Sequence, residues 1–265
     1  MRLTTALMLA ALAWAAVPSR SVVVATTMDV GADLPVDRPI YQQAGPHKKE
    51  KPPKPTAPPN RVQDLLAPPV PQPELYGKPL PSRSDSVVFV LDISGSMAWE
   101  DAPYTDLTGA VQTGPRMARA RVALQRGILS LRDGWRFNVV AYDHTIKQLW
   151  PELVRSSEAS RQGACAWVAQ LHPGGSTATG PAVAQALWCD RTNMLVVLVS
   201  DGAPNVGVSP DDGSPACAAA HRQMIRFYNT QKATVDVFGI SATGAMRQFC
   251  LDVAAENRGA FTDVR

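Results

Sequence analysis

Apolar runs without polar alternation constrain the fold of this chain more than any other feature. Three of them, Val87–Leu91, Met194–Ser200 and Val235–Ile240, consist mainly of aliphatic and aromatic residues. A half-exposed strand alternates apolar and polar residues, whereas a strand covered on both faces of a parallel sheet is apolar nearly throughout. The runs therefore predict central strands of a parallel sheet with helices on both sides.

Segments with helical spacing separate these runs. We expect helices at Met117–Leu131, Glu158–Leu171, Pro181–Leu187, Pro215–Tyr228 and Ala245–Glu256. Further strands are expected at Phe137–Tyr142, Ile146–Trp150 and Ala260–Val264. The connection between the first two of these is so short that it implies a hairpin, and hence one antiparallel edge strand. The sequence predicts an α/β fold with a doubly wound, mostly parallel sheet of about six strands flanked by helices.

The first residues resemble a secretory signal. Arg2 precedes the apolar stretch Leu3–Val17, and small-residue cleavage patterns occur at Ala13–Ala15 and Val23–Ala25. The stretch is shorter than the ~20 residues of a membrane span, so cleavage is favoured over an uncleaved anchor. We expect residues 1–25 to be a signal peptide and the mature protein to be secreted or periplasmic, with no membrane span left after cleavage.

Most of the chain's 23 prolines lie in its first 85 residues. Such composition favours an extended chain that cannot bury a core, so residues 26–81 are expected to be a disordered Pro-rich linker. Residues 82–265 are then expected to form one folded domain. Residues 1–85 carry 10 Lys and Arg against 7 Asp and Glu, which leaves 16 of each kind in the remainder. Because a nucleic-acid-binding domain is expected to carry excess positive charge, a neutral folded part argues against a nucleic-acid partner.

Four cysteines, Cys165, Cys189, Cys217 and Cys250, lie in the predicted domain and none forms a C-x-x-C pair. In an oxidising compartment an even number indicates two disulfides, and buried free thiols are the alternative. We expect Cys165–Cys189 and Cys217–Cys250, because each pair would join consecutive helices.

Three fragments carry polar side chains to the predicted carboxyl edge of the sheet. Asp92, Ser94 and Ser96 follow the first apolar run, Asp201 follows a second, and Thr177 lies in the loop Gly174–Gly180. Ligands of open α/β sheets bind at this edge. Two carboxylates and three hydroxyls form an all-oxygen set, which suits Mg²⁺ or Mn²⁺ rather than zinc.

These fragments resemble the metal-ion-dependent adhesion site of the von Willebrand factor type A family. The likeness covers about Ser86 to Arg265 and consists of D-x-S-x-S-M, a Gly-Gly-x-Thr loop and a strand ending in Asp-Gly, in the family's order. It implies a Rossmann-like fold, and inner ligands at Ser94, Ser96 and Thr177 supported by Asp92 and Asp201. It also implies that an Asp or Glu of a protein partner completes the metal's coordination.

We expect neighbouring residues to play smaller roles. Asp143 is either a support beside the ligands or a hairpin-turn residue, and Ser176 is the alternative to Thr177 as hydroxyl donor. The polar insertion that begins at Trp99 is either a specificity loop or a solvated surface loop.

The sequence favours a non-enzymatic adhesion or assembly module. A metal-dependent hydrolase and a non-catalytic component of a cell-envelope complex remain alternatives. Ser94 is not in a G-x-S-x-G elbow, and no G-x-x-x-x-G-K or G-x-G-x-x-G pattern follows a strand.

Overall fold

A computed structural model describes residues 72–80, 85–99 and 102–264 of the chain. The expected signal peptide 1–25 and residues 26–71 of the expected linker lie outside these ranges. Among the described residues the main sheet has seven strands, in the order β11-β10-β9-β3-β6-β7, with β8 also pairing with β6. They are β3 (Ser86–Asp92), β6 (Arg136–Tyr142), β7 (Ile146–Gln148), β8 (Val154–Arg155), β9 (Leu195–Ser200), β10 (Thr234–Ile240) and β11 (Phe261–Val264).

The predicted fold class is confirmed. Strands β11, β10, β9, β3 and β6 are parallel, and both β7 and β8 pair with β6 in the antiparallel direction. The sheet therefore has one strand more than the sequence suggested. The additional strand is the two-residue β8, which is too short to leave a pattern in the sequence.

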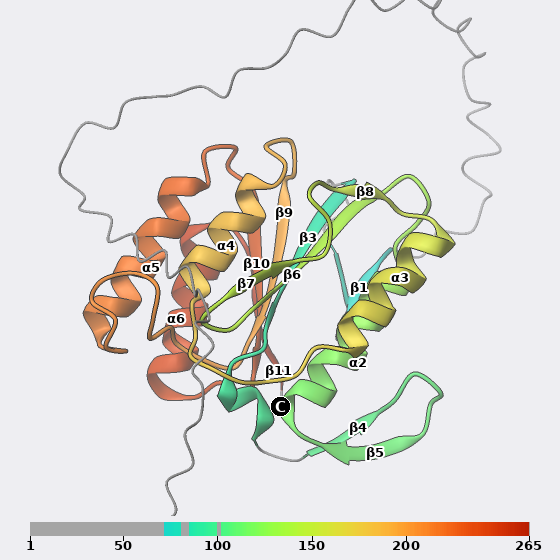
Figure 1. The fold of residues 1–265 in the computed structure, drawn as a ribbon, viewed down its shortest axis with the longest axis horizontal. Helices are drawn as coiled ribbons and strands as arrows, with labels where there is room; N and C mark the ends of the chain where they lie inside the picture. Colours follow the sequence, from blue (N-terminus) through green and yellow to red (C-terminus); the bar gives the residue numbers. More distant parts are fainter. Residues whose placement is uncertain (1–71, 81–84, 100–101, 265) are drawn as a thin grey trace, which may run out of the picture. The chain divides into compact units, whose positions relative to one another are not determined.

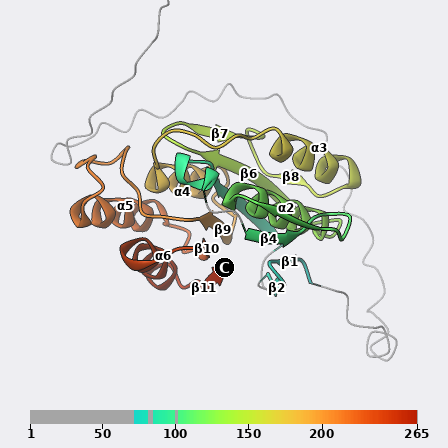
Figure 2. The same cartoon turned by 90° about the horizontal axis from the view of Figure 1, so that it is seen from below.

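Helices cover both faces of the sheet (Figures 1 and 2). On one face lie α2 (Arg116–Leu129) and α3 (Glu158–Ala169); on the other lie α4 (Thr179–Trp188), α5 (Pro215–Tyr228) and α6 (Gly244–Glu256). Strand β3 explains the continuous apolar run, because Phe89 and Leu91 pack into the first core while Val88 and Val90 pack into the second. Each such side chain contributes about 1.5–3 kcal/mol by leaving water.

A small hairpin precedes the sheet and corrects part of the linker prediction. Strands β1 (Glu74–Leu75) and β2 (Lys78–Pro79) pair, Leu75 and Leu80 are buried, and the ring of Tyr76 stacks on Phe238 with centroids 5.6 Å apart. The expectation of a disordered linker is therefore wrong for residues 72–80. Two leucines and a tyrosine are enough apolar surface to hold a Pro-flanked hairpin against α2.

The polar insertion after β3 is also a hairpin. Strands β4 (Ala102–Thr105) and β5 (Val111–Gly114) are antiparallel, and the η1 turn (Gly95–Ala98) lies between β3 and this hairpin. In the turn, Asp106 Oδ1 accepts hydrogen bonds from the backbone N–H groups of Thr108 and Ala110. The segment is thus an ordered protrusion and not an irregular loop, and its role in specificity stays a prediction.

The predicted disulfides are wrong for this structure. All four cysteines lie in described segments and are free thiols. Cys165 packs against the core on the α2–α3 side and Cys189 against the core on the α4–α6 side, so the sheet separates them. Cys217 directs its sulfur toward the Pro204 carbonyl oxygen at 3.7 Å, whereas Cys250 is buried in the core under α6.

None of the helices in the described ranges is both long enough and apolar enough to cross a membrane.

Candidate functional site

The candidate site lies where the sheet changes its winding direction. From β3 the chain passes through α2 to β6 on one side, and it later returns to β9 on the other side of β3. The carboxyl ends of β3 and β9 are neighbours, while their following segments diverge. Such a switch point forms a crevice and is the usual ligand position in this fold class. Asp92 is the last residue of β3, and Asp201 directly follows β9.

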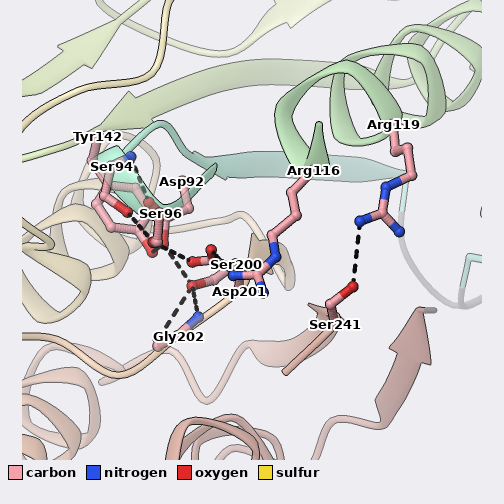
Figure 3. Close-up of polar contacts among 10 residues, drawn as sticks. All are labelled: Asp92, Ser94, Ser96, Arg116, Arg119, Tyr142, Ser200, Asp201, Gly202 and Ser241. Carbon is pink, nitrogen blue, oxygen red and sulfur yellow. Dashed lines mark hydrogen bonds and ion pairs between the residues drawn. The ribbon is translucent and has the colours of Figure 1, made fainter. Parts of the chain in front are cut away.

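Asp92 is held rigidly by its neighbours (Figure 3). Its Oδ1 accepts the Ser94 backbone N–H at 2.8 Å, and its Oδ2 accepts the Ser200 hydroxyl at 2.6 Å and the Tyr142 hydroxyl at 3.2 Å. The side chain is fully buried. Both carboxylate oxygens are therefore satisfied by donors, and the carboxylate in turn fixes the loop that carries Ser94.

The two predicted serines connect Asp92 to Asp201. The Ser94 and Ser96 hydroxyl oxygens are 3.3 Å apart, and the Ser96 hydroxyl donates to Asp201 Oδ1 at 2.9 Å. A hydroxyl that donates its proton to a carboxylate keeps its lone pairs for another partner. Four of the five predicted site residues thus form one hydrogen-bonded group.

Thr177 is brought to the same edge by backbone hydrogen bonds. Its N–H donates to Asn205 Oδ1 at 2.8 Å, and the Asn205 N–H donates to the Thr177 carbonyl at 3.0 Å. Two glycines that precede Thr177 in its loop bind the segment after β3. The Gly175 carbonyl accepts the Gly95 N–H at 3.0 Å, and the Gly174 N–H donates to the Ile93 carbonyl at 2.8 Å. The loop of Thr177 is therefore joined to the loops that follow β3 and β9.

Ser176 and Asp143 are placed less favourably as donors. Ser176 is exposed, whereas Thr177 is buried. Asp143 lies in the turn between β6 and β7, where its Oδ1 accepts the N–H and the hydroxyl of Thr145. Its backbone carbonyl contacts the site loop by accepting the Ala178 N–H at 2.9 Å. Asp143 therefore holds the turn between β6 and β7, and its role as a support beside the ligands stays a prediction.

Two carboxylates this close interact strongly. Burial first, and then the charge of Asp201, raise the pKa of Asp92 to about 6, while hydrogen bonds from Ser200 and Ser94 oppose the rise. Charge repulsion of this kind is relieved by a cation. In the structure that cation is Arg116, whose Nη1 lies 2.7 Å from Asp201 Oδ2.

The residues present fit a hard divalent cation. The group offers oxygen donors from two buried carboxylates and three hydroxyls, and Arg116 pairs with Asp201. No group of three or more His, Cys, Asp or Glu side chains suited to a metal occurs in the described part of the chain. The set here has two acids, and hydroxyls provide the other donors, as Mg²⁺ or Mn²⁺ accepts.

Sequence reasoning missed Tyr142, Ser200, Asn205 and Arg116. Tyr142 and Ser200 are the last residues of β6 and β9, so their place at strand ends was a signal that could have found them. Asn205 and Arg116 lie in a loop and on a helix, and only the folded chain shows that they contact Thr177 and Asp201.

His221 supports the site from α5. Its Nδ1 accepts the Gly180 N–H at 2.8 Å, in the first turn of the helix that follows Thr177, and the side chain is fully buried. Burial lowers the pKa of His221 from 6.5 to about 4, against the opposing charge of Asp211. Between these values the unfolded chain binds the proton and the folded chain does not, so the free energy of unfolding falls as the pH falls.

This predicts that the free energies of unfolding of the wild type and a His221→Asn variant differ by an amount that depends on pH. In the variant the amide oxygen can replace Nδ1 as acceptor. From pH 7 to pH 5 the wild type should lose about 2 kcal/mol relative to the variant. Urea unfolding of both proteins at each pH measures it. The comparison with the variant is needed because folding raises the pKa of Asp92. Asp92 therefore makes the free energy of unfolding rise as the pH falls, which is opposite to the effect of His221. A difference that does not change with pH would refute this role of His221.

Comparison with known proteins gives one family and several distant relatives. Residues 85–260 match the family model of the von Willebrand factor type A domain. The inter-alpha-trypsin inhibitor heavy chain H2 of Mus musculus is 27% identical over 140 residues, which is 49% of this chain and 13% of that protein. The inter alpha-trypsin inhibitor heavy chain 4 of Mus musculus is 27% identical over 139 residues, which is 48% of this chain and 13% of that protein. The match spans only a small part of these relatives' length.

Solved structures share the fold. A von Willebrand factor type A protein from Catenulispora acidiphila has a TM-score of 0.53 at 24% identity, covering 69% of this chain and 39% of the other. The pilus adhesin SpaC from Lactobacillus rhamnosus GG has a TM-score of 0.51 at 15% identity, covering 68% and 28%. At these identities the likeness concerns the fold alone.

Proposed function

Because this chain belongs to the von Willebrand factor type A domain family, whose members are protein-interaction and adhesion modules, we propose that residues 82–265 bind a protein partner through a divalent cation. One observation carries the proposal. Asp92, Ser94, Ser96 and Asp201 form one hydrogen-bonded group at the switch point of the sheet, in which Asp92 accepts the Ser94 backbone N–H.

Each residue has a definite task in this proposal. The hydroxyls of Ser94, Ser96 and Thr177 would contact Mg²⁺ or Mn²⁺, while Asp92 and Asp201 orient the serines and balance the charge. When bound, the cation supplies a position that can accept a carboxylate oxygen. Hydroxyl ligands are neutral and therefore leave more of the cation's charge to attract an acid than a cage of carboxylates would.

The partner proposed is a protein that presents an Asp or Glu side chain. We propose binding and no catalytic role. The N-terminal sequence from Arg2 to Val17 supports a secreted or periplasmic site of action.

The first test is calorimetric titration of Mg²⁺ and Mn²⁺ into the chelator-stripped chain. We expect saturable binding that weakens at least about tenfold in Ser96→Ala, because this change removes one donor and the proton shared with Asp201. Ser241→Ala is the matched control, since its hydroxyl contacts Arg119 and not the carboxylates.

A second titration contains glutarate as a free carboxylate. Glutarate should tighten metal binding in the wild type, because the acid would fill the open position of the cation. Absence of saturable binding at millimolar metal, both with and without glutarate, would contradict the proposed function.

A further inference from the structure

The ion pair between Arg116 and Asp201 lies inside the candidate site. Arg116 Nη1 donates to Asp201 Oδ2 at 2.7 Å, and the exposed fractions of the two side chains are 12% and 1% (Figure 3). The other oxygen of the same carboxylate accepts the Ser96 hydroxyl. Each oxygen of Asp201 therefore accepts a donor from the protein itself.

The position of Arg116 in its helix is unfavourable for the helix. Arg116 is the first residue of α2, where the helix dipole is positive and acidic residues are preferred; no acidic residue occurs in this first turn. Its backbone N–H donates to the Trp99 carbonyl at 3.1 Å, which places it beside the η1 turn. The guanidinium charge of Arg116 therefore does not stabilise the helix dipole, and it pairs with the Asp201 carboxylate of the site.

We propose that Arg116 is a built-in counter-ion that occupies the site in place of the metal and competes with it for Asp201. The inference rests on the proposed function and adds a means of regulation to it. Two buried carboxylates need positive charge nearby in the absence of metal. Arg116 supplies one unit of this charge and keeps the metal-free domain folded. A divalent cation and a guanidinium beside the same carboxylate repel each other, so each weakens the other.

Calorimetric titration of Mg²⁺ and Mn²⁺ into Arg116→Met tests the competition. We expect this variant to bind either metal at least about tenfold more tightly than the wild type, because a competing cation has been removed. Arg116→Lys keeps the charge and should stay near the wild type. Arg121→Met is the control on the same helix, since its guanidinium donates to the Leu171 carbonyl.

Thermal unfolding gives a reading that does not depend on metal affinity. In EDTA the Arg116→Met variant should melt below the wild type, because the carboxylates then lack a counter-ion. Saturating Mg²⁺ should remove the difference. A melting temperature equal to that of the wild type in EDTA would contradict the counter-ion role.

The outcomes separate this inference from the proposed function. Equal or weaker metal binding by Arg116→Met, beside clear binding by the wild type, overturns the inference and leaves the function standing. Binding by both proteins, tighter in the variant, supports both, whereas binding by neither overturns both. Should the variant fail to fold, the side-chain NMR signal of Arg116 in the wild type decides, since Mg²⁺ must shift it if the pair is broken.

Discussion

An Asp92→Asn variant is expected to lose Mg²⁺ binding by more than about a hundredfold while it keeps its fold. The amide oxygen can still accept the Ser94 N–H, and the amide nitrogen can donate to the Ser200 hydroxyl, which rotates to accept it. The variant also removes the repulsion with Asp201, so its melting temperature in EDTA should equal or exceed that of the wild type. Binding and stability should therefore change in opposite directions, which calorimetry and thermal unfolding together would reveal.

The choice of asparagine matters for this experiment. Asp92→Ala would leave buried donors without an acceptor, and each unsatisfied group costs about 1–3 kcal/mol, so a loss of binding would be confounded with a loss of fold. Asp236→Asn is the control. Asp236 lies on β10, accepts the Ala260 N–H and takes no part in the proposed site. Unchanged metal affinity in Asp92→Asn would exclude Asp92 from the site.

A Gly259→Ala variant is expected to lose at least about 4 kcal/mol of its free energy of unfolding. Gly259 connects α6 to β11, and a Cβ there would lie 1.8 Å from the Val235 carbonyl oxygen and 2.4 Å from its carbonyl carbon. The obstacle is the backbone of β10, which no side-chain rotation can relieve. Urea unfolding, or the yield of soluble protein if the variant does not fold, measures the effect.

Gly163→Ala is the matched control for this substitution. Gly163 lies within α3, and its Cβ would meet nothing within 4 Å. Alanine is the better helix former, so this change should leave stability equal or raise it by up to about 1 kcal/mol. A Gly259→Ala variant as stable as the wild type would mean that α6 and β11 can separate from β10 without loss.

The fold could be predicted from the sequence because its strongest signals are local. Val87–Leu91 is apolar at every position, and burial of every residue of β3 is the reason. Asp92 and Asp201 could be placed at one edge because the carboxyl ends of parallel strands meet there. Helices with clear boundary signals, such as Pro215–Tyr228, were predicted with the bounds that the structure has.

The remaining features depend on contacts between distant parts of the chain. Arg116 and Asp201 are 85 residues apart, and no local pattern links them. The predicted Cys165–Cys189 disulfide assumed that consecutive helices are neighbours, but the chain crosses from one face of the sheet to the other between α3 and α4. The hairpin at residues 72–80 was hidden by proline composition, since its stability comes from α2 and Phe238.

Strand β3 belongs to both hydrophobic cores, which couples the unfolding of the two helix layers. Its alternate side chains complete the packing on each face, so neither layer of helices can come away without exposing this strand. The two halves of the domain are therefore one unfolding unit. A ligand that binds at Asp92, on the end of this strand, stabilises both layers together through mass action. Occupancy of the proposed site would thus raise the free energy of unfolding of the whole domain.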